Sequence, residues 1–291
     1  MKLRLLGPSD KLLNAYIKIT GSKSESNRLL LLKALYPGIT IKNLSNSDDA
    51  AVMQRGISLK EGKVDIHHAG TAMRFLTAFF ASREGANVIL TGSSRMQERP
   101  IKILVNALKN LGAEIDYLEN EGFPPLRIRG QNLTESKVSL PADVSSQYIS
   151  ALLLVAPGLE KGLELELLGK ITSIPYIKMT LGLLKQIGVN SSFEGNVVRV
   201  LPKKSIGELT LTVESDWSSA SYFYSIAALS EIGTKISLSS YRRDSLQGDS
   251  ILIEIYKLFG VDTEFKEDSI VLFKAGPQEQ DAIEYDLANA P

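Results

Sequence analysis

The sequence predicts an α/β protein that is built from a repeated unit. Three helical patterns end at the glycines Gly112, Gly188 and Gly260, which are 76 and 72 residues apart. A second helical pattern precedes each of these glycines, and it starts 42 or 43 residues upstream. These upstream starts carry small or hydroxyl-bearing residues, namely Gly70, Ser145 and Ser218. A fixed period of this kind is the signature of a repeat architecture.

Short strand-like runs separate the helical patterns and follow them. Residues 86–90 and 164–168 lie between the two helices of their units and are rich in Val, Ile and Leu. After the first terminal glycine come two further strand-like stretches, 113–117 and 126–130. Each unit is therefore expected to read helix, strand, helix, strand, strand.

An earlier and more divergent unit is predicted near the start of the chain. Its apolar run, residues 29–32, is preceded by serines and closed by Pro37-Gly38, and its second helix is expected near Ser47. The units then start near residues 23, 70, 145 and 218. A period of about 73 residues places the next start near residue 291, so we expect the chain to stop at a unit boundary.

Composition excludes several functional classes. The 33 basic residues balance the 33 acidic residues, so no overall charge favours nucleic acid or a membrane surface. The absence of cysteine excludes disulfides, thiolate metal sites and a cysteine nucleophile. No apolar run approaches the roughly 18 residues of a membrane span, and the N-terminus does not read as a signal peptide. We therefore expect a cytoplasmic protein.

Several predicted helix starts combine free backbone N–H groups with cations. Lys23 and Ser24 open one helix, and Arg28 follows Ser24 by four residues and so shares its face. Arg95 and Arg99 have the same spacing just before another helix. Cations or neutral donors stand at other starts, namely Arg74, Ser145, Ser146, Gln147, Ser173 and Tyr176. A lone serine is ordinarily a cap and a lone arginine is ordinarily solvated, but their coincidence in one repeat system favours a phosphate or carboxylate site.

Read together, seven ordered segments resemble the EPSP synthases, the 3-phosphoshikimate 1-carboxyvinyltransferases. The segments are 21–28 (GSKSESNR), 69–74 (AGTAMR), 90–92 with 95–100 (LTG and RMQERP), 145–147 (SSQ), 173–176 (SIPY), 214–222 (ESDWSSASY) and 246–249 (LQGD). They cover almost the whole chain.

The resemblance implies a two-domain inside-out α/β barrel of the enolpyruvyl transferase type. In this fold each domain has three such units around a pseudo-threefold axis, and the active site lies in the cleft between the domains. By that pattern residues 16–215 form the first domain. Residues 1–15 plus 216–291 form the second domain, which is incomplete here.

The resemblance also implies a reaction and its site residues. The enolpyruvyl group of phosphoenolpyruvate passes to the 5-hydroxyl of shikimate 3-phosphate, and phosphate is released without a metal or an organic cofactor. By the resemblance, the catalytic residue Lys23 contacts both substrates, while Ser24 and Arg28 contact the shikimate moiety. Gly70 and Arg99 are implied to contact phosphoenolpyruvate. The 3-phosphate is implied to be held by Ser145, Ser146 and Ser173. Gln147 is implied to lie between the substrates, and Tyr176 to contact shikimate 3-phosphate. We expect a monomer without nucleic-acid or membrane partners.

Two departures from the family pattern affect this interpretation. His67-His68 stands where the family usually has Gly-Asn, and an ordinary loop pair is favoured over a catalytic or metal role for these histidines. The family's general-base aspartate directly follows a proline that corresponds to Pro291, and its later C-terminal motifs are also absent here. We therefore expect this chain alone to be inactive or nearly so.

Three alternative functions stay open. The sister family transfers enolpyruvate to UDP-N-acetylglucosamine, but it normally uses a loop cysteine and a Lys-Asn opening, whereas this chain has no cysteine and opens with Lys23-Ser24. A second alternative is a non-catalytic fragment that binds phosphorylated metabolites. A third is a purely structural repeat scaffold.

Overall fold

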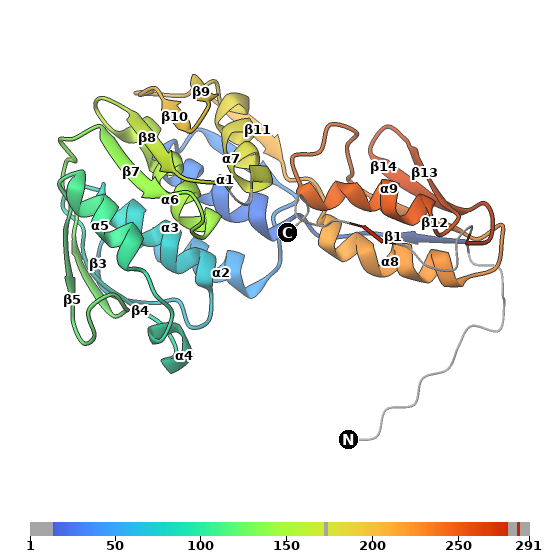
Figure 1. Cartoon of the computed structure of the whole chain (residues 1–291), viewed down its shortest axis with the longest axis horizontal. Coiled ribbons are helices and arrows are strands. Elements are labelled where there is room, and N and C mark those ends of the chain that lie inside the picture. Colours follow the sequence, from blue (N-terminus) through green and yellow to red (C-terminus); the bar gives the residue numbers. More distant parts are fainter. Residues whose placement is uncertain (1–13, 172–173, 279–283, 286–291) are drawn as a thin grey trace. The chain divides into compact units, whose positions relative to one another are not determined.

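The chain divides into two compact units in a computed structural model that describes residues 14–171, 174–278 and 284–285 (Figure 1). Unit 1 comprises Met1–Gly21 and Glu214–Pro291, and unit 2 comprises Ser22–Val213. The domain boundaries expected near residues 16 and 215 stay a prediction. Ser173 and the segment that ends at Pro291 lie outside the described residues.

One sheet topology recurs three times in the described part of the chain. The strand orders are β3-β4-β6-β5 and β7-β8-β10-β9 in unit 2, and β1-β12-β14-β13 in unit 1. In each sheet the first pair is parallel and the other two pairs are antiparallel. The strands are β3 (Glu61–Asp65), β4 (Asn87–Thr91), β5 (Glu114–Tyr117), β6 (Leu126–Arg129), β7 (Lys137–Pro141), β8 (Leu163–Leu168), β9 (Ser191–Glu194), β10 (Val197–Val200), β1 (Asn14–Ile17), β12 (Lys235–Ser239), β13 (Val261–Phe265) and β14 (Ser269–Lys274). The predicted repeat is thus confirmed. Each sheet has one additional strand: β3 and β7 directly precede the first helix of their repeats, whereas β1 comes from the N-terminal segment.

The helices of unit 2 form its core. They are α1 (Lys23–Leu35), α2 (Asp48–Ile57), α3 (Gly70–Ala81), α4 (Ser94–Gln97), α5 (Lys102–Asn110), α6 (Ser146–Val155) and α7 (Ile174–Gln186). Helix α3 packs against α1, α2 and α6, and it is buried over almost its whole length because its side chains are apolar on every face. The strands β3 and β5 lie at the periphery of the unit (Figure 1).

The repeated glycines mark helix ends for a conformational reason. Gly112, Gly188 and Gly260 have φ angles of 106°, 73° and 70°. Only glycine adopts this left-handed region without a steric cost, and it is the usual residue just beyond a helix. The glycines follow α5, α7 and α9 (Leu252–Lys257), so the period in the sequence reflects three helix ends of the same geometry.

Two strands come from distant parts of the chain. In unit 1, β1 pairs in parallel with β12, so Asn14 lies opposite Lys235. In unit 2, β11 (Leu209–Thr212) pairs in parallel with β2 (Ile39–Lys42), so Leu209 lies opposite Ile39. In each unit, one of these pairings joins a strand from the later part of the chain to a strand near the N-terminal end of that unit.

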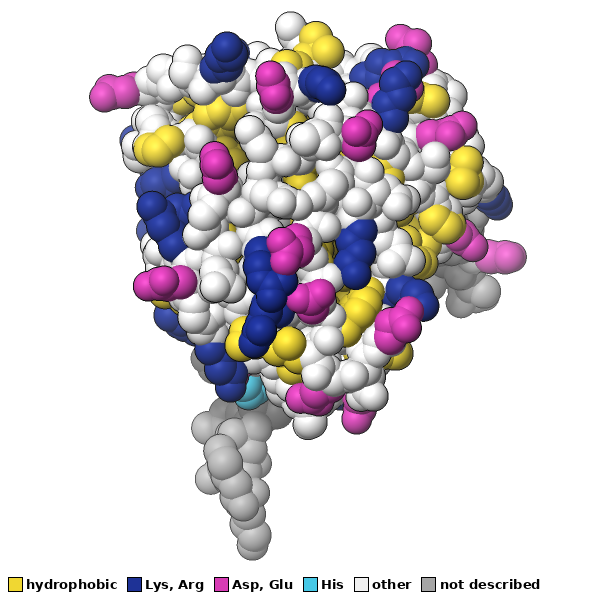
Figure 2. Space-filling view, turned by 90° about the vertical axis from the view of Figure 1, so that its left-hand side faces the viewer, with side chains coloured by type: hydrophobic (Ala, Val, Ile, Leu, Met, Phe, Trp, Pro, Cys, Tyr) yellow, Lys and Arg dark blue, Asp and Glu magenta, His cyan; other side chains and the backbone are white. Residues whose placement is uncertain are grey.

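The outward faces of the unit 2 sheets are polar and mixed in charge. In β8, Leu163, Leu165 and Leu167 are buried while Glu164 and Glu166 face outward. Figure 2 shows basic and acidic side chains interspersed over this side of the molecule. Arg129, for example, forms ion pairs with Glu114 and Asp116. Lys137 and Arg199 likewise form ion pairs with Glu164.

A buried carboxylate fixes the start of helix α8 (Trp217–Leu229) in unit 1. Glu214 is 1 % exposed, and its Oε1 accepts hydrogen bonds from Trp217 Nε1 at 3.0 Å and from the Arg242 backbone N–H at 2.9 Å. Its Oε2 accepts from Ser245 Oγ at 2.6 Å and from Gln247 Nε2 at 3.1 Å. The two segments 214–222 and 246–249 are thus joined by one hydrogen-bonded network. Burial of a carboxylate is tolerated here because four donors surround it.

Helix α8 carries an exposed apolar stripe. Tyr222, Ile226 and Leu229 are 73 %, 44 % and 90 % exposed, and their spacing places them on one side of the helix. The opposite side packs into the unit 1 core through the buried Trp217 and Tyr224. In α6, which occupies the same place in its own repeat, Ile149 and Leu153 lie 73 residues before Tyr222 and Ile226 and are fully buried. The stripe therefore has the composition of a helix interface and lies exposed in this chain.

Substitution of Leu229 by lysine is expected to change the unfolding free energy of unit 1 by less than about 0.5 kcal/mol, because the side chain is already exposed. The same substitution is expected to reduce binding of the dye ANS and self-association, since it breaks an apolar patch. Dye fluorescence and analytical ultracentrifugation measure both effects. A large loss of stability in Leu229→Lys would show that the stripe is covered.

Among the residues that the structure describes, no helix has the length and apolar character needed to cross a bilayer.

Candidate functional site

The start of helix α3 has no side-chain cap and has a cation close to it. Its cap residue, Ala69, offers no side-chain acceptor, so the first N–H groups of the helix are not capped by a side chain. The Arg99 guanidinium lies directly over the Cα of Gly70, and a Cβ at this position would overlap it. A side chain at residue 70 would therefore push the end of the Arg99 side chain away from the helix start. Arg99 thus places a cation at the positive end of the α3 dipole, where an anion would contact both.

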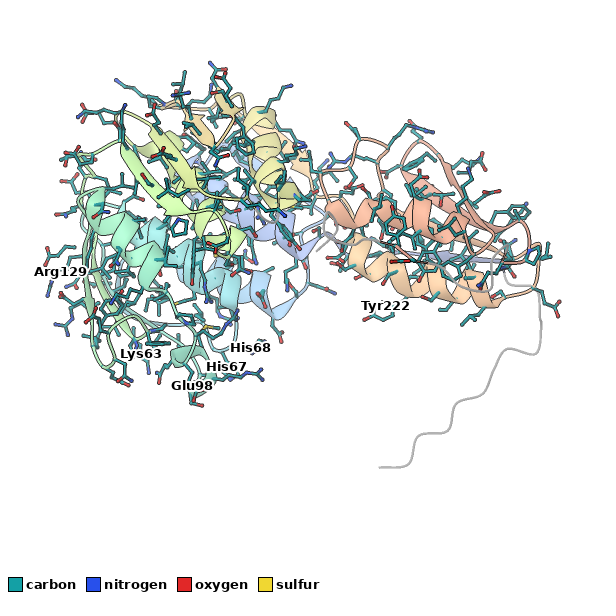
Figure 3. All side chains as sticks on the ribbon, in the orientation of Figure 1. Lys63, His67, His68, Glu98, Arg129 and Tyr222 are labelled. Atoms are coloured by element: carbon teal, nitrogen blue, oxygen red, sulfur yellow. The ribbon has the colours of Figure 1, made fainter. Side chains whose placement is uncertain are left out.

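A pocket of about 520 Å³ opens beside this helix start. It is lined by His68, Ser93, Arg95, Met96 and Arg99. Figure 3 shows His67, His68 and Glu98 at this end of unit 2, near α4. Within the described part of the chain, neither the Arg95 nor the Arg99 guanidinium has a carboxylate within ion-pair distance. Both cations are thus available to an anionic ligand, unlike Arg129 on the outer sheet face.

Arg74 holds the backbone around this site in place through hydrogen bonds. Its Nη1 donates to the Gly70 carbonyl oxygen at 3.1 Å and its Nη2 to the Pro100 carbonyl oxygen at 3.2 Å. The Tyr148 hydroxyl also donates to the Pro100 carbonyl, at 2.6 Å. The Arg74 and Arg99 guanidinium groups thus both lie next to Gly70. Burial lowers the pKa of Arg74, and the charge of Arg99 lowers it further. Arg74 therefore ties the turn that carries Arg99 to the start of α3.

The start of helix α6 lies beside that of α3. Ser145 caps α6, since its Oγ accepts from the Gln147 backbone N–H at 3.4 Å. The Gln147 Nε2 donates to Thr71 Oγ1, in the first turn of α3, at 3.3 Å. Ser145 is exposed, whereas Ser146 is 8 % exposed. The hydroxyl-bearing start of α6 and the cationic start of α3 are thus joined through Gln147.

The start of helix α1 holds the remaining cations named from the sequence. Ser22 caps α1, and Lys23 is exposed in its first turn beside the half-buried Ser24. Arg28 is turned inward, and its Nε and Nη2 donate to Thr180 Oγ1 and Ser150 Oγ, each at 2.9 Å. The half-buried Tyr176 ring lies 5.8 Å from the Arg28 guanidinium carbon.

The described members of the predicted site fall into three groups, and the lining of the Arg99 pocket does not include them all. Gly70 with Arg99 forms the first group, Gln147 with Ser145 and Ser146 the second, and Arg28 with Tyr176 the third. Lys23 and Ser24 share α1 with Arg28, and the lining of the Arg99 pocket does not include them. Ser173 lies outside the described residues.

Two supporting residues went unnoticed in the sequence, Ser150 and Thr180, which accept the hydrogen bonds of Arg28. Both are polar residues within apolar helical runs, and that signal could have identified them. His67 and His68 were interpreted as a loop pair, and the described residues contain no group of three His, Cys, Asp or Glu side chains that could hold a metal ion.

Unit 1 has a larger hollow that is less suited to an anion. It has a volume of about 790 Å³ and lies over the exposed face of the β1-β12-β14-β13 sheet. Its lining mixes Lys235, Arg243 and Lys266 with Asp262 and Glu264, and no helix starts there. The Arg99 pocket is smaller but combines unpaired cations with a helix start.

Comparison with known proteins identifies relatives over most of the chain. Residues 54–291 match the family described as EPSP synthase (3-phosphoshikimate 1-carboxyvinyltransferase). A curated 3-phosphoshikimate 1-carboxyvinyltransferase of Bacteroides fragilis (strain YCH46) is 48 % identical over 277 residues, which cover 95 % of this chain and 67 % of the relative. The protein of the same name from Histophilus somni (strain 2336) is 39 % identical over 94 % of this chain and 69 % of its own length.

A solved structure of EPSP synthase from Acinetobacter baumannii has the same fold. It superposes with a TM-score of 0.76 at 20 % sequence identity, over 91 % of this chain and 66 % of that chain. The likeness confirms the predicted fold class, an inside-out α/β fold of repeated units. The chain spans about two thirds of the length of the relatives it matches.

Proposed function

The chain belongs to the EPSP synthase family, and we propose from this membership that it takes part in the transfer of the enolpyruvyl group from phosphoenolpyruvate to the 5-hydroxyl of shikimate 3-phosphate. In this transfer the 5-hydroxyl oxygen loses its proton and bonds to C2 of phosphoenolpyruvate, while C3 gains a proton. The tetrahedral intermediate then loses a proton from C3 and its C2–O bond to phosphate, which restores the double bond. The protein belongs, on this proposal, to the shikimate pathway of aromatic amino-acid biosynthesis.

One observation carries the proposal, which is the position of Arg99. Its guanidinium lies over Gly70 at the start of α3 and has no carboxylate partner among the described residues. A phosphate ester at this point would accept hydrogen bonds from the guanidinium and from the first N–H groups of the helix. Because both substrates and the released phosphate are anionic, fixed donors of this kind stabilise the negative charge throughout the reaction.

The other contacts are proposed from family membership and, for the described residues, from their place in the fold. We assign Gly70 and Arg99 to phosphoenolpyruvate. We assign Ser145 and Ser146 to the 3-phosphate, since the start of α6 lies beside that of α3. Ser173 is assigned to the 3-phosphate from family membership alone. Lys23 is proposed to contact both substrates, Ser24, Arg28 and Tyr176 to hold the shikimate moiety, and Gln147 to lie between the substrates. A cytoplasmic location, a monomeric state and the absence of nucleic-acid or membrane partners stay predictions.

Calorimetry with each substrate tests the proposal. We expect shikimate 3-phosphate to bind to the chain and phosphoenolpyruvate to bind after it, whereas UDP-N-acetylglucosamine should give no heat. An assay of phosphate release in the same mixture separates an enzyme from a non-catalytic binding fragment. Absence of binding by both phosphate esters would contradict the proposal and favour a structural scaffold.

A further inference from the structure

Two adjacent histidines lie at the edge of the Arg99 pocket, in the loop between β3 and α3. The Nδ1 atoms of His67 and His68 are 2.7 Å apart, and their rings meet edge to face. The loop is fixed by two backbone hydrogen bonds. The His67 N–H donates to Asp65 Oδ1 at 2.8 Å, and the His67 carbonyl accepts from the Ser93 N–H at 2.9 Å. His67 has a φ of 50°, a left-handed conformation that these contacts hold in place.

The short Nδ1 contact constrains the protons of both rings. A hydrogen bond between two Nδ1 atoms needs one N–H and one lone pair, so one ring donates and the other accepts. The accepting ring is then neutral at Nδ1 and carries its proton on Nε2. A pair of metal ligands would look different, because two nitrogens on one tetrahedral zinc ion lie roughly 3.3 Å apart. The distance therefore indicates a proton shared between the rings.

The two rings are not equivalent with respect to the pocket. His68 lines it together with Arg95 and Arg99, and His67 does not. His68 is also two residues before Gly70, where α3 begins. An anion in this pocket would be repelled by a lone pair on the pocket-facing ring and attracted by an N–H.

The geometry points to a specific role for this pair, which rests on the proposed function. His67 donates its Nδ1–H to His68 Nδ1, and this fixes His68 as the tautomer that carries its proton on Nε2. His68 then donates that N–H to an oxygen of phosphoenolpyruvate held by Arg99. His68 is a substrate-binding residue, and His67 is a positioning residue that acts through it. The contact adds a directional donor to the site without adding a charge.

Nitrogen NMR tests the tautomer directly, because the chain contains only two histidines. In the full chain labelled with ¹⁵N-histidine, we expect two-bond ¹H–¹⁵N spectra to show one ring with a bare Nδ1 and a protonated Nε2. The variant His67→Phe leaves a single ring and so assigns the signals. In this variant the remaining ring, His68, should populate both tautomers. A bare Nε2 on His68 in the unsubstituted chain would overturn the inference.

Binding measurements test the contact to the ligand. His68→Phe should bind phosphoenolpyruvate about tenfold more weakly, since it loses a hydrogen bond to a charged group. His68→Asn keeps a side-chain donor and should stay within about threefold of the unsubstituted chain. The His68 Nε2 signal should also move when phosphoenolpyruvate is added. Equal affinity in His68→Phe and the unsubstituted chain would overturn this inference alone, whereas no binding by the unsubstituted chain would overturn the proposed function as well.

Discussion

Replacement of Arg28 by alanine is expected to lower the unfolding free energy of unit 2 by about 3 kcal/mol. The side chain is 3 % exposed and donates to Thr180 Oγ1, Ser150 Oγ and the Ser24 carbonyl oxygen, each at 2.9 Å. Burial lowers the pKa of Arg28 to about 10, so the guanidinium is still charged at neutral pH. Removing it breaks hydrogen bonds that join α1 to α6 and α7, and it leaves a cavity beside Phe75.

Urea denaturation followed by far-UV circular dichroism measures this loss. Trp217 is the one tryptophan of the chain and lies in unit 1, so its fluorescence reports separately on the unfolding of unit 1. Arg28→Lys should recover little stability, because a lysine cannot donate in three fixed directions. Arg129→Ala is the matched control, since this arginine of the same unit is exposed on the sheet. If Arg28→Ala were as stable as Arg129→Ala, the inward hydrogen bonds would be energetically unimportant.

The repeat, and with it most of the fold, could be predicted from the sequence because each unit repeats local signals. The predicted helix starts at 23, 70, 145 and 218 lie within one residue of the observed starts Lys23, Gly70, Ser146 and Trp217. Glycines at helix ends and serines at helix starts reflect local backbone geometry over a few residues, so they can be recognised without knowledge of the tertiary structure. The strand β3 was missed because Glu61-Gly62-Lys63 lacks apolar alternation. The pairing of β1 with β12 could not be predicted because it joins segments more than 200 residues apart.

The site was predicted less completely than the fold, because burial and partner choice are tertiary properties. The spacing of Ser24 and Arg28 correctly placed them on one face of α1, and Arg28 Nη1 donates to the Ser24 carbonyl. Nothing local showed that the rest of the guanidinium would be enclosed by α6 and α7. The role of Gly70 was similarly hidden, because it depends on Arg99, which lies 29 residues further along the chain.

Arg99→Ala is expected to weaken phosphoenolpyruvate binding by about 100-fold. The guanidinium is exposed and unpaired among the described residues, and it lies over the uncapped start of α3. Arg74 cannot replace this charged, two-pronged donor, because its guanidinium already donates to the carbonyl oxygens of Gly70 and Pro100. Stability should change little, because the Arg99 side chain makes no hydrogen bond within the described structure.

Calorimetric titration of phosphoenolpyruvate into three proteins tests the central claim that the start of α3 is the anion site. The titrations use the unsubstituted chain, Arg99→Ala and Arg129→Ala, each with saturating shikimate 3-phosphate. Both variants lose one positive charge from unit 2, but only Arg99 lies at the helix start. We expect Arg129→Ala to bind like the unsubstituted chain and Arg99→Ala to lose nearly all measurable heat. Equal affinities for the two variants would place the anion elsewhere and contradict the account.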